Sequence, residues 1–351
     1  MAFRFDLPPK AEKQERLVVT SELERPDGTH PEFHIDVLSD GKPKIIAFWD
    51  VDKTLVNLEG PMRAIRPAMW PEAFEKDDLE EVSAVHLAGY QLGNMWRELY
   101  RMYGIYTQGK RQWNDPAAYE ADFLAPGKDG EHIDKAGDSY HEFADKLLQR
   151  FDGIATRVID EQYQKDPHTF DHEKIKPMYH LAEVYRRLGN PQVGMSANPR
   201  GYIRAVCKYL GLSEYFIDCA TDTDVAGLKE HKMKYLTAAL EAKGIQVPYD
   251  RLVIVGDSPT GDVGSGPRFR ELMHKEKPAI NVVARGLLVV ENAEALRAAE
   301  EKIGHDPELR QLVETLRWDK VKPSRYGVPA IGSRYDDGFL EPLKSPAERK
   351  G

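Results

Sequence analysis

The pattern of hydrophobic and polar positions divides the chain into regions of different character. Residues 45–49, with the sequence IIAFW, form an uninterrupted apolar run, which is typical of a strand buried on both faces of a sheet. Before it, residues 16–23 and 32–38 have strand-like composition, and the PDGT sequence at 26–29 is typical of a turn. We therefore predict a β-hairpin that leads into the strand at 45–49.

Apolar residues then recur at helical spacing between about residues 60 and 170. They are Leu79, Val82, Val85, Leu92, Trp96, Leu99 and Tyr103, followed by Tyr140, Phe143, Leu147, Phe151, Ile154 and Val158. Convincing strand patterns are absent from this part of the sequence. We predict an all-helical domain over residues 61–170.

After residue 170 the pattern alternates between strands and helices. A helix is expected to begin at Pro177 and to end at Gly189, because proline favours the first helical position and glycine the position after the last. Further strands are predicted at 192–195, 216–220, 252–255 and 280–283, and further helices at 198–211, 232–243, 293–303 and 307–317. This alternation predicts an α/β fold with a doubly wound, Rossmann-like parallel sheet.

The predicted domain organisation follows from these changes of pattern. Residues 1–43 form an N-terminal extension with the hairpin, and residues 44–60 and 171–320 form the α/β core. The helical domain at 61–170 is inserted into that core. Residues 321–351 are rich in proline, glycine and charge, so we expect an irregular C-terminal tail.

Composition and charge narrow the function classes. The net charge of −9 argues against a non-specific nucleic-acid binder. The two cysteines, Cys207 and Cys219, have neither disulfide-framework nor metal-site spacing, and we expect both to be buried thiols. The sequence shows no secretion signal and no apolar run of the roughly 20 residues that span a bilayer. A cytoplasmic protein without a membrane partner is expected.

Polar residues follow several of the predicted strands. Asp50 and Asp52 follow the first strand of the core, Ser196 follows the second, and Asp257 follows a later one, with Asp262 close behind. Ligands of open α/β sheets bind beyond the carboxyl ends of the strands, so these side chains are expected to gather at one edge. Four neighbouring carboxylates would raise at least one pKa. A hard divalent cation such as Mg²⁺ would relieve that repulsion.

These segments resemble the motifs of the haloacid dehalogenase superfamily, in its phosphatase branch. DVDKT at 50–54 resembles the first motif, hhhhDxDxT, although Lys53 stands where the commonest form has glycine. VGMS at 193–196 resembles the second, and VIVGDSPTGD at 253–262 the fourth. Lys232, at the head of the predicted helix closed by Gly244, resembles the third. Of the neighbouring lysines, Lys229 and Lys234 are expected to be solvated.

The resemblance implies a role for each residue of these motifs. Asp50 would be the nucleophile that forms an aspartyl-phosphate, and Asp52 would be the general acid and then the base. Mg²⁺ would be bound by Asp50, Asp52 through its backbone carbonyl, and Asp257. Ser196 and Lys232 would hold the phosphoryl oxygens. Thr54 would belong to the same phosphate-binding group and would steady the turn of the first motif. Asp262 would support Lys232 or a metal-bound water.

The inserted domain resembles the helical cap of the same family, where large caps usually accompany small soluble substrates. The cap tryptophans are expected to pack in its interior, while Arg101, Lys110 and Arg111 either steer an anionic substrate or are solvated. Asp52 favours phosphate-ester over carbon–halogen cleavage, because an alkoxide leaves poorly without a proton. The expected activity is a Mg²⁺-dependent phosphomonoesterase acting on a small phosphorylated metabolite.

Three alternatives stay open at this stage. One is a phosphotransferase or mutase of the same fold, and another is a catalytically silent binding protein. The third, a phosphatase of nucleic-acid ends, is disfavoured by the acidic net charge and by the large predicted cap. The sequence indicates neither the particular phosphate ester nor the oligomeric state.

Overall fold

The structure is a computed structural model that describes part of the chain. The described residues are 15–52, 54–55, 156–157, 160–161, 163–165, 178–196, 200–221, 224–225, 228–290, 293–307, 313–317, 322–323 and 329–330. Most of the predicted cap at 61–170, most of the C-terminal tail, and Lys53 lie outside them. The described residues between 156 and 165 are helical. The domain boundaries therefore stay a prediction.

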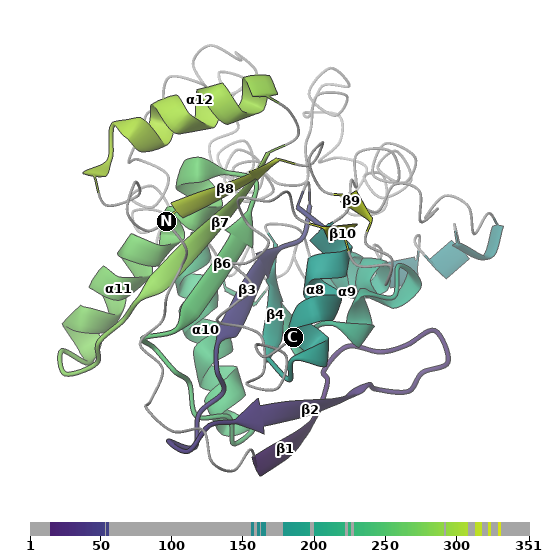
Figure 1. Ribbon diagram of the computed structural model, residues 1–351. Helices are drawn as coiled ribbons and strands as arrows, with labels where there is room; N and C mark the ends of the chain where they lie inside the picture. The colour runs from purple at the N-terminus through teal and green to yellow at the C-terminus, as the bar shows by residue number, and fades with distance from the viewer. Residues whose placement is uncertain are drawn as a thin grey trace, which may run out of the picture.

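A six-stranded parallel sheet forms the core of the described structure (Figure 1). Its strands are β3 (Ile46–Asp50), β4 (Gln192–Met195), β5 (Asp218–Ala220), β6 (Leu252–Gly256), β7 (Ala284–Val290) and β8 (Val313–Arg317). Their order in the sheet is β5-β4-β3-β6-β7-β8, which confirms the predicted doubly wound, Rossmann-like α/β fold. The strand order reverses between β3 and β6, and ligands of such sheets bind beyond the carboxyl ends at that point.

Helices cover both faces of this sheet. They are α8 (Met178–Arg187), α9 (Arg200–Tyr209), α10 (Lys229–Ala242), α11 (Ser265–Glu276) and α12 (Ala293–Gly304), with a short 3-10 helix, η5 (Leu212–Glu214). On one face, Trp49 of β3 packs against Tyr185 of α8, with ring centroids 5.7 Å apart. Phe48, which points the other way, shares a hydrophobic cluster with Met233 of α10. The continuous apolar run of β3 is explained by this burial on both sides.

Several helix ends lie where the sequence predicts them. Gly189, Gly211 and Gly244 have the positive φ angles of 64°, 68° and 84° that favour glycine after a helix. The beginning of α10 differs, because it starts at Lys229 and not near residue 232. Cys207 and Cys219 are both buried free thiols, as predicted.

Two predicted elements at the C-terminal side of the core are wrong. The strand expected at 280–283 lies instead at Ala284–Val290, as β7. The prediction ended before this strand because Arg285 and Gly286, which belong to β7, interrupt the apolar pattern of the sequence. The helix expected at 307–317 is replaced, at its end, by β8, which pairs in parallel with β7. The tail also contributes a short antiparallel pair, β9 (Lys322–Pro323) with β10 (Pro329–Ala330).

The predicted N-terminal hairpin is confirmed as β1 (Glu15–Thr20) paired with β2 (Glu32–Val37). It packs against the amino ends of the core strands. The Asp36 amide donates to Gly189 O, and the Glu22 amide donates to Ile217 O, just before β5. The hairpin thus lies at the end of the sheet opposite the carboxyl edge, at the bottom of the view in Figure 1. Within the described part of the chain, no helix has the length and apolar character needed to cross a membrane.

Candidate active site

The first element of the site is the turn that follows β3. Asp50 is the last residue of this strand and is 8% exposed. The Thr54 hydroxyl, which is fully buried, donates a 3.0 Å hydrogen bond to Asp50 Oδ2. The Leu55 amide closes the turn by donating to Val51 O at 3.0 Å. One oxygen of the Asp50 carboxylate is therefore held in place by the turn of its own segment.

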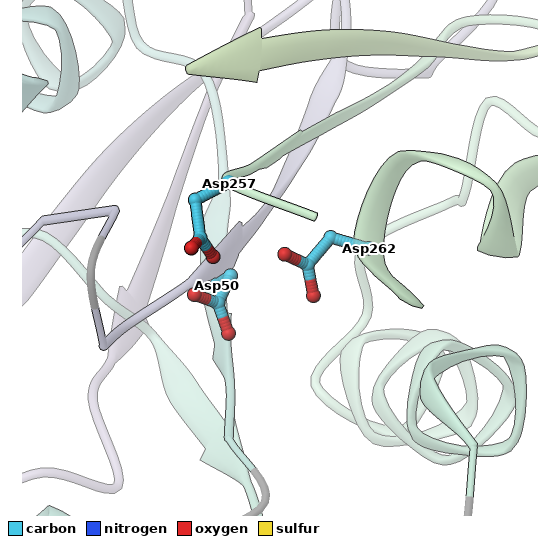
Figure 2. A group of neighbouring side chains, drawn as sticks. All are labelled: Asp50, Asp257 and Asp262. Atoms are coloured by element: carbon cyan, nitrogen blue, oxygen red, sulfur yellow. The ribbon is translucent and has the colours of Figure 1, made fainter. Parts of the chain in front are cut away.

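Two further carboxylates converge on Asp50 from the segment that follows the neighbouring strand, β6 (Figure 2). Asp257 directly follows β6, and Asp262 lies in a π-helical turn, η6 (Pro259–Val263). One oxygen from each of the three carboxylates lies within 4.8 Å of the others. The parallel pairing of β3 with β6, in which Trp49 lies beside Val255, brings the two strand ends together. The sequence prediction that distant acids gather at this edge therefore holds for these three residues.

Local structure explains how Asp262 reaches this position. Its Oδ2 accepts a 2.9 Å hydrogen bond from the Ser258 amide, and the Ser258 hydroxyl in turn accepts one from the Gly261 amide at 2.9 Å. Asp262 also packs directly against Gly256, where an added Cβ would lie only 2.2 Å from Asp262 Cβ. The glycine of the GDSPTGD segment is required for this close approach.

The site also contains a lysine with a largely covered side chain, Lys229, from the first turn of α10. Its Nζ forms an ion pair with Asp50 Oδ1, donates to Met195 O at 3.2 Å, and lies 3.4 Å from Asp262 Oδ1. The side chain is only 12% exposed. The expectation that Lys229 is solvated is therefore wrong, because α10 begins one turn earlier than the sequence suggested.

The other two lysines of this helix lie in different surroundings. Lys232 is buried, at 1% exposure, and its predicted role in phosphate binding stays a prediction. Lys234 is exposed and pairs with Glu276 of α11, as expected for a solvated residue. Lys229 is the lysine that the structure places in direct contact with the Asp50 carboxylate.

The sequence carried little signal that Lys229 would contact Asp50. The residue before α10 is Leu228, whose backbone is extended at φ −75° and ψ 158° and whose side chain makes no capping hydrogen bond. Helix starts are usually recognised from Ser, Thr, Asp or Asn at this position. Because such a residue is missing, the sequence predicted a start near residue 232, which lies inside the observed helix α10.

Ionisation in the site is strongly coupled. Burial raises the pKa of the Asp50 carboxyl well above its usual range, and the charge of Asp262 raises it further, while Lys229 opposes both. Burial alone would lower the pKa of Lys229, but Asp50 and Asp262 outweigh it and raise that pKa above its usual value. The lysine therefore stays protonated at neutral pH, and the crowded carboxylates disfavour a full set of negative charges.

The donor set fits a hard divalent cation. Three carboxylates with one neighbouring ammonium leave two formal negative charges in a mostly buried cluster. Carboxylate oxygens are the ligands that Mg²⁺ prefers in proteins. Asp50, Asp257 and Asp262 could therefore hold such an ion together.

Two more predicted site residues, Ser196 and Asp52, lie at the same edge of the sheet. Ser196 directly follows β4, is 1% exposed, and donates its amide to Ala220 O at 2.9 Å. It adjoins Met195, whose carbonyl accepts from Lys229. Asp52 lies two residues beyond β3 and is half-buried. Their catalytic and binding roles stay predictions.

A comparison with family models now identifies the relationship. The haloacid dehalogenase-like hydrolase model matches residues 46–270, well over half of the chain. The chain belongs to this family. The matched range includes β3, β4, β6, Lys229 and all three clustered aspartates. A search among curated proteins gave no match.

Many solved structures are also similar to this haloacid dehalogenase-like chain. The Bacillus subtilis HAD-hydrolase YfnB, solved with bound magnesium, is 10% identical with a TM-score of 0.32, and the match covers 70% of this chain and 87% of that one. A cytosolic 5'-nucleotidase IIIB bound to cytidine is 11% identical with a TM-score of 0.41, covering 88% and 87%. A β-phosphoglucomutase-like protein from Thermotoga maritima is 17% identical with a TM-score of 0.29, covering 72% and 90%. The family assignment rests on the matched model and not on these remote likenesses.

Proposed function

We propose that this hydrolase is a Mg²⁺-dependent phosphomonoesterase that acts on a small phosphorylated metabolite. The observation that carries the proposal is the surroundings of Asp50. This buried carboxylate ends a central strand at the switch point of the sheet, contacts Lys229, and shares a cluster with Asp257 and Asp262. A nucleophilic carboxylate beside cationic groups suits the attack on a phosphate ester.

In the proposed reaction, an oxygen of Asp50 attacks phosphorus while the bond from phosphorus to the ester oxygen breaks. Asp52 gives its proton to that leaving oxygen, so that an alcohol departs and an aspartyl-phosphate remains. Asp52 then takes a proton from water, whose oxygen attacks phosphorus while the bond from phosphorus to Asp50 breaks. Inorganic phosphate leaves, and the Asp50 carboxylate is restored. The hydrogen bond from Thr54 supports this role of Asp50, because it fixes the orientation of the carboxylate.

Positive charge around the transferring group is the second part of the proposal. We assign Lys229, in place of Lys232, to the phosphoryl oxygens, since its Nζ already lies beside Asp50. Ser196, at the end of the adjacent strand β4, is the proposed hydroxyl partner. A Mg²⁺ ion bound by Asp50, Asp257 and Asp262, with the predicted help of the Asp52 carbonyl, would supply further charge stabilisation.

The proposed substrate is small because of the predicted helical cap at 61–170, which resembles the large caps of the family. A cap over the carboxyl edge would exclude macromolecules and water from the cleft. The acidic net charge of −9 gives no support to a nucleic-acid substrate. These arguments favour a soluble metabolite over a phosphorylated polymer end.

A panel of phosphorylated metabolites tests the proposal, with inorganic phosphate release measured in Mg²⁺ or in EDTA. We expect wild type to release phosphate with Mg²⁺ but not with EDTA, and Asp50→Asn to release none in either condition. Asp27→Asn, in an exposed turn of the hairpin, is the matched control and should behave as wild type. Equal turnover by wild type and Asp50→Asn would remove Asp50 as the nucleophile. Release of the alcohol without equal phosphate would indicate a phosphotransferase.

A further inference from the structure

Arg268, on α11, lies outside the sequence motifs but connects two parts of the candidate site. Its Nε donates a 3.0 Å hydrogen bond to Glu230 Oε1 on α10. Its Nη1 donates to Thr260 O at 2.9 Å, and its Nη2 donates to Gly261 O at 3.4 Å. One guanidinium therefore joins the start of α10 to the turn η6.

Two of the three partners of Arg268 adjoin a residue of the aspartate and lysine cluster. Glu230 follows Lys229 directly in the sequence, and Gly261 directly precedes Asp262. Lys229 Nζ and Asp262 Oδ1 are themselves 3.4 Å apart. The guanidinium thus contacts the side chain of the residue that follows Lys229 and the backbone carbonyl of the residue that precedes Asp262.

The surroundings favour a positioning role over a solvated surface pair. Glu230 is only 5% exposed, and its other oxygen, Oε2, is buried without a hydrogen-bond partner in the described structure. A buried carboxylate with one free oxygen depends strongly on the charge of its remaining partner. The planar guanidinium has several donors in a fixed arrangement, which a lysine cannot reproduce.

We propose that Arg268 is a positioning residue that sets the distance between Lys229 and Asp262 through Glu230 and the η6 carbonyls. The inference builds on the proposed phosphatase function. If Lys229 acts on the transferring phosphoryl group, displacing it reduces stabilisation of the transition state more than it reduces substrate binding. The expected result is a lower kcat with little change in KM.

The same two helices supply a matched control. Lys234 of α10 pairs with Glu276 of α11 at an exposed position, away from the site. Removing this pair breaks an ion pair between α10 and α11 but leaves Glu230 and η6 untouched. Three variants are therefore compared with wild type: Arg268→Met, Arg268→Lys and Lys234→Met.

The first measurement is steady-state hydrolysis of 4-nitrophenyl phosphate with Mg²⁺. Arg268→Met is expected to lower kcat about tenfold, which is within the range that small displacements of catalytic groups cause. Arg268→Lys should recover little of this loss, and Lys234→Met should retain the wild-type kcat. A wild-type kcat in Arg268→Met, or full recovery in Arg268→Lys, would overturn the proposal.

The second measurement is hydrogen exchange of the amides of Ser258 and of residues 260–264, which requires no activity. The Ser258 amide donates to Asp262, so its exchange reports the position of that side chain. We expect faster exchange in Arg268→Met and unchanged exchange in Lys234→Met. Identical exchange in wild type and Arg268→Met would contradict the positioning role. If the amides exchange faster in Arg268→Met than in wild type, but wild type hydrolyses no phosphate ester, the proposed function fails and the positioning role stands.

Discussion

Lys229 differs from the neighbouring lysines of α10 in its direct contact with the Asp50 carboxylate. The sequence offered three lysines within one and a half turns of α10, and the structure separates them by contact and burial. Lys229 contacts Asp50, whereas Lys234 pairs with Glu276 on the surface. A cation beside the proposed nucleophile can oppose the negative charge of a transferring phosphoryl group.

We predict that Lys229→Met lowers kcat for phosphate-ester hydrolysis by about 10²- to 10³-fold, as loss of one transition-state charge partner commonly does. Lys234→Met should leave kcat unchanged, since its side chain lies on the surface. Steady-state kinetics in saturating Mg²⁺ provides the measurement, with circular dichroism to check folding. A smaller loss in Lys229→Met than in Lys232→Met would return the phosphate-binding role to Lys232.

Much of the candidate site could be predicted at the residue scale because its acids follow strands. The positions of Asp50 and Asp257 depend only on where β3 and β6 end, and parallel pairing then brings them together. Asp262 follows from the short turn that packs it on Gly256. Lys229 could not be chosen in the same way, because its place depends on a helix start without a polar capping residue.

At the scale of elements, local sequence patterns predicted the strands that are buried throughout. They failed for a strand whose conformation depends on pairing with its neighbour in the sheet. Strands β3, β4 and β6 are buried throughout, and the sequence predicted each of them within one residue of its observed bounds. β8 is an edge strand, and its VETLR sequence has no such run. Leu309, Leu312 and Leu316 are spaced as in a helix, but pairing with β7 determines the strand conformation.

Helix ends give a prediction at this scale. Gly189 and Gly211 have similar left-handed backbones, with φ of 64° and 68°. A Cβ at Gly189 would lie 2.8 Å from the Asp36 amide nitrogen of the hairpin, whereas a Cβ at Gly211 would have no atom within 4 Å. The two positions therefore differ in packing but not in backbone conformation.

Gly211→Ala is expected to lower the free energy of unfolding by about 1–2 kcal/mol through its left-handed backbone alone. Gly189→Ala should cost about 1 kcal/mol or more beyond that, because the added methyl group displaces β2. Urea unfolding of both variants measures the difference. Equal destabilisation would show that the hairpin moves freely away from Gly189, contrary to its packing in the structure.

At the scale of the whole molecule, the two ends of the sheet differ in what lies against them. The hairpin covers the amino ends, where Val19, Phe33 and Ile35 join the central hydrophobic cluster. The carboxyl ends carry three neighbouring carboxylates, which repel one another in the absence of a metal ion. Apolar burial elsewhere in the fold thus offsets electrostatic repulsion in the candidate site.

This division predicts how a cation affects global stability. If Mg²⁺ binds Asp50, Asp257 and Asp262 in the folded state alone, an ion concentration tenfold above Kd raises the free energy of unfolding by about 1.4 kcal/mol. Asp257→Asn should weaken this effect, because it removes one proposed ligand. In EDTA the same variant should be at least as stable as wild type, since the Asp257 charge is one cause of the raised pKa of Asp50.

Thermal unfolding of both proteins in Mg²⁺ and in EDTA measures these two effects together. The expected result is a reversal: wild type is the more stable protein with Mg²⁺, and Asp257→Asn equals or exceeds it with EDTA. Asp27→Asn, an exposed substitution in the hairpin, should respond to Mg²⁺ as wild type does. If Asp257→Asn and wild type gain equal stability from Mg²⁺, then Asp257 is not a ligand. If Asp257→Asn is the less stable protein in EDTA as well, the carboxylates do not repel one another. Relief of that repulsion then does not explain how Mg²⁺ binding would stabilise this fold.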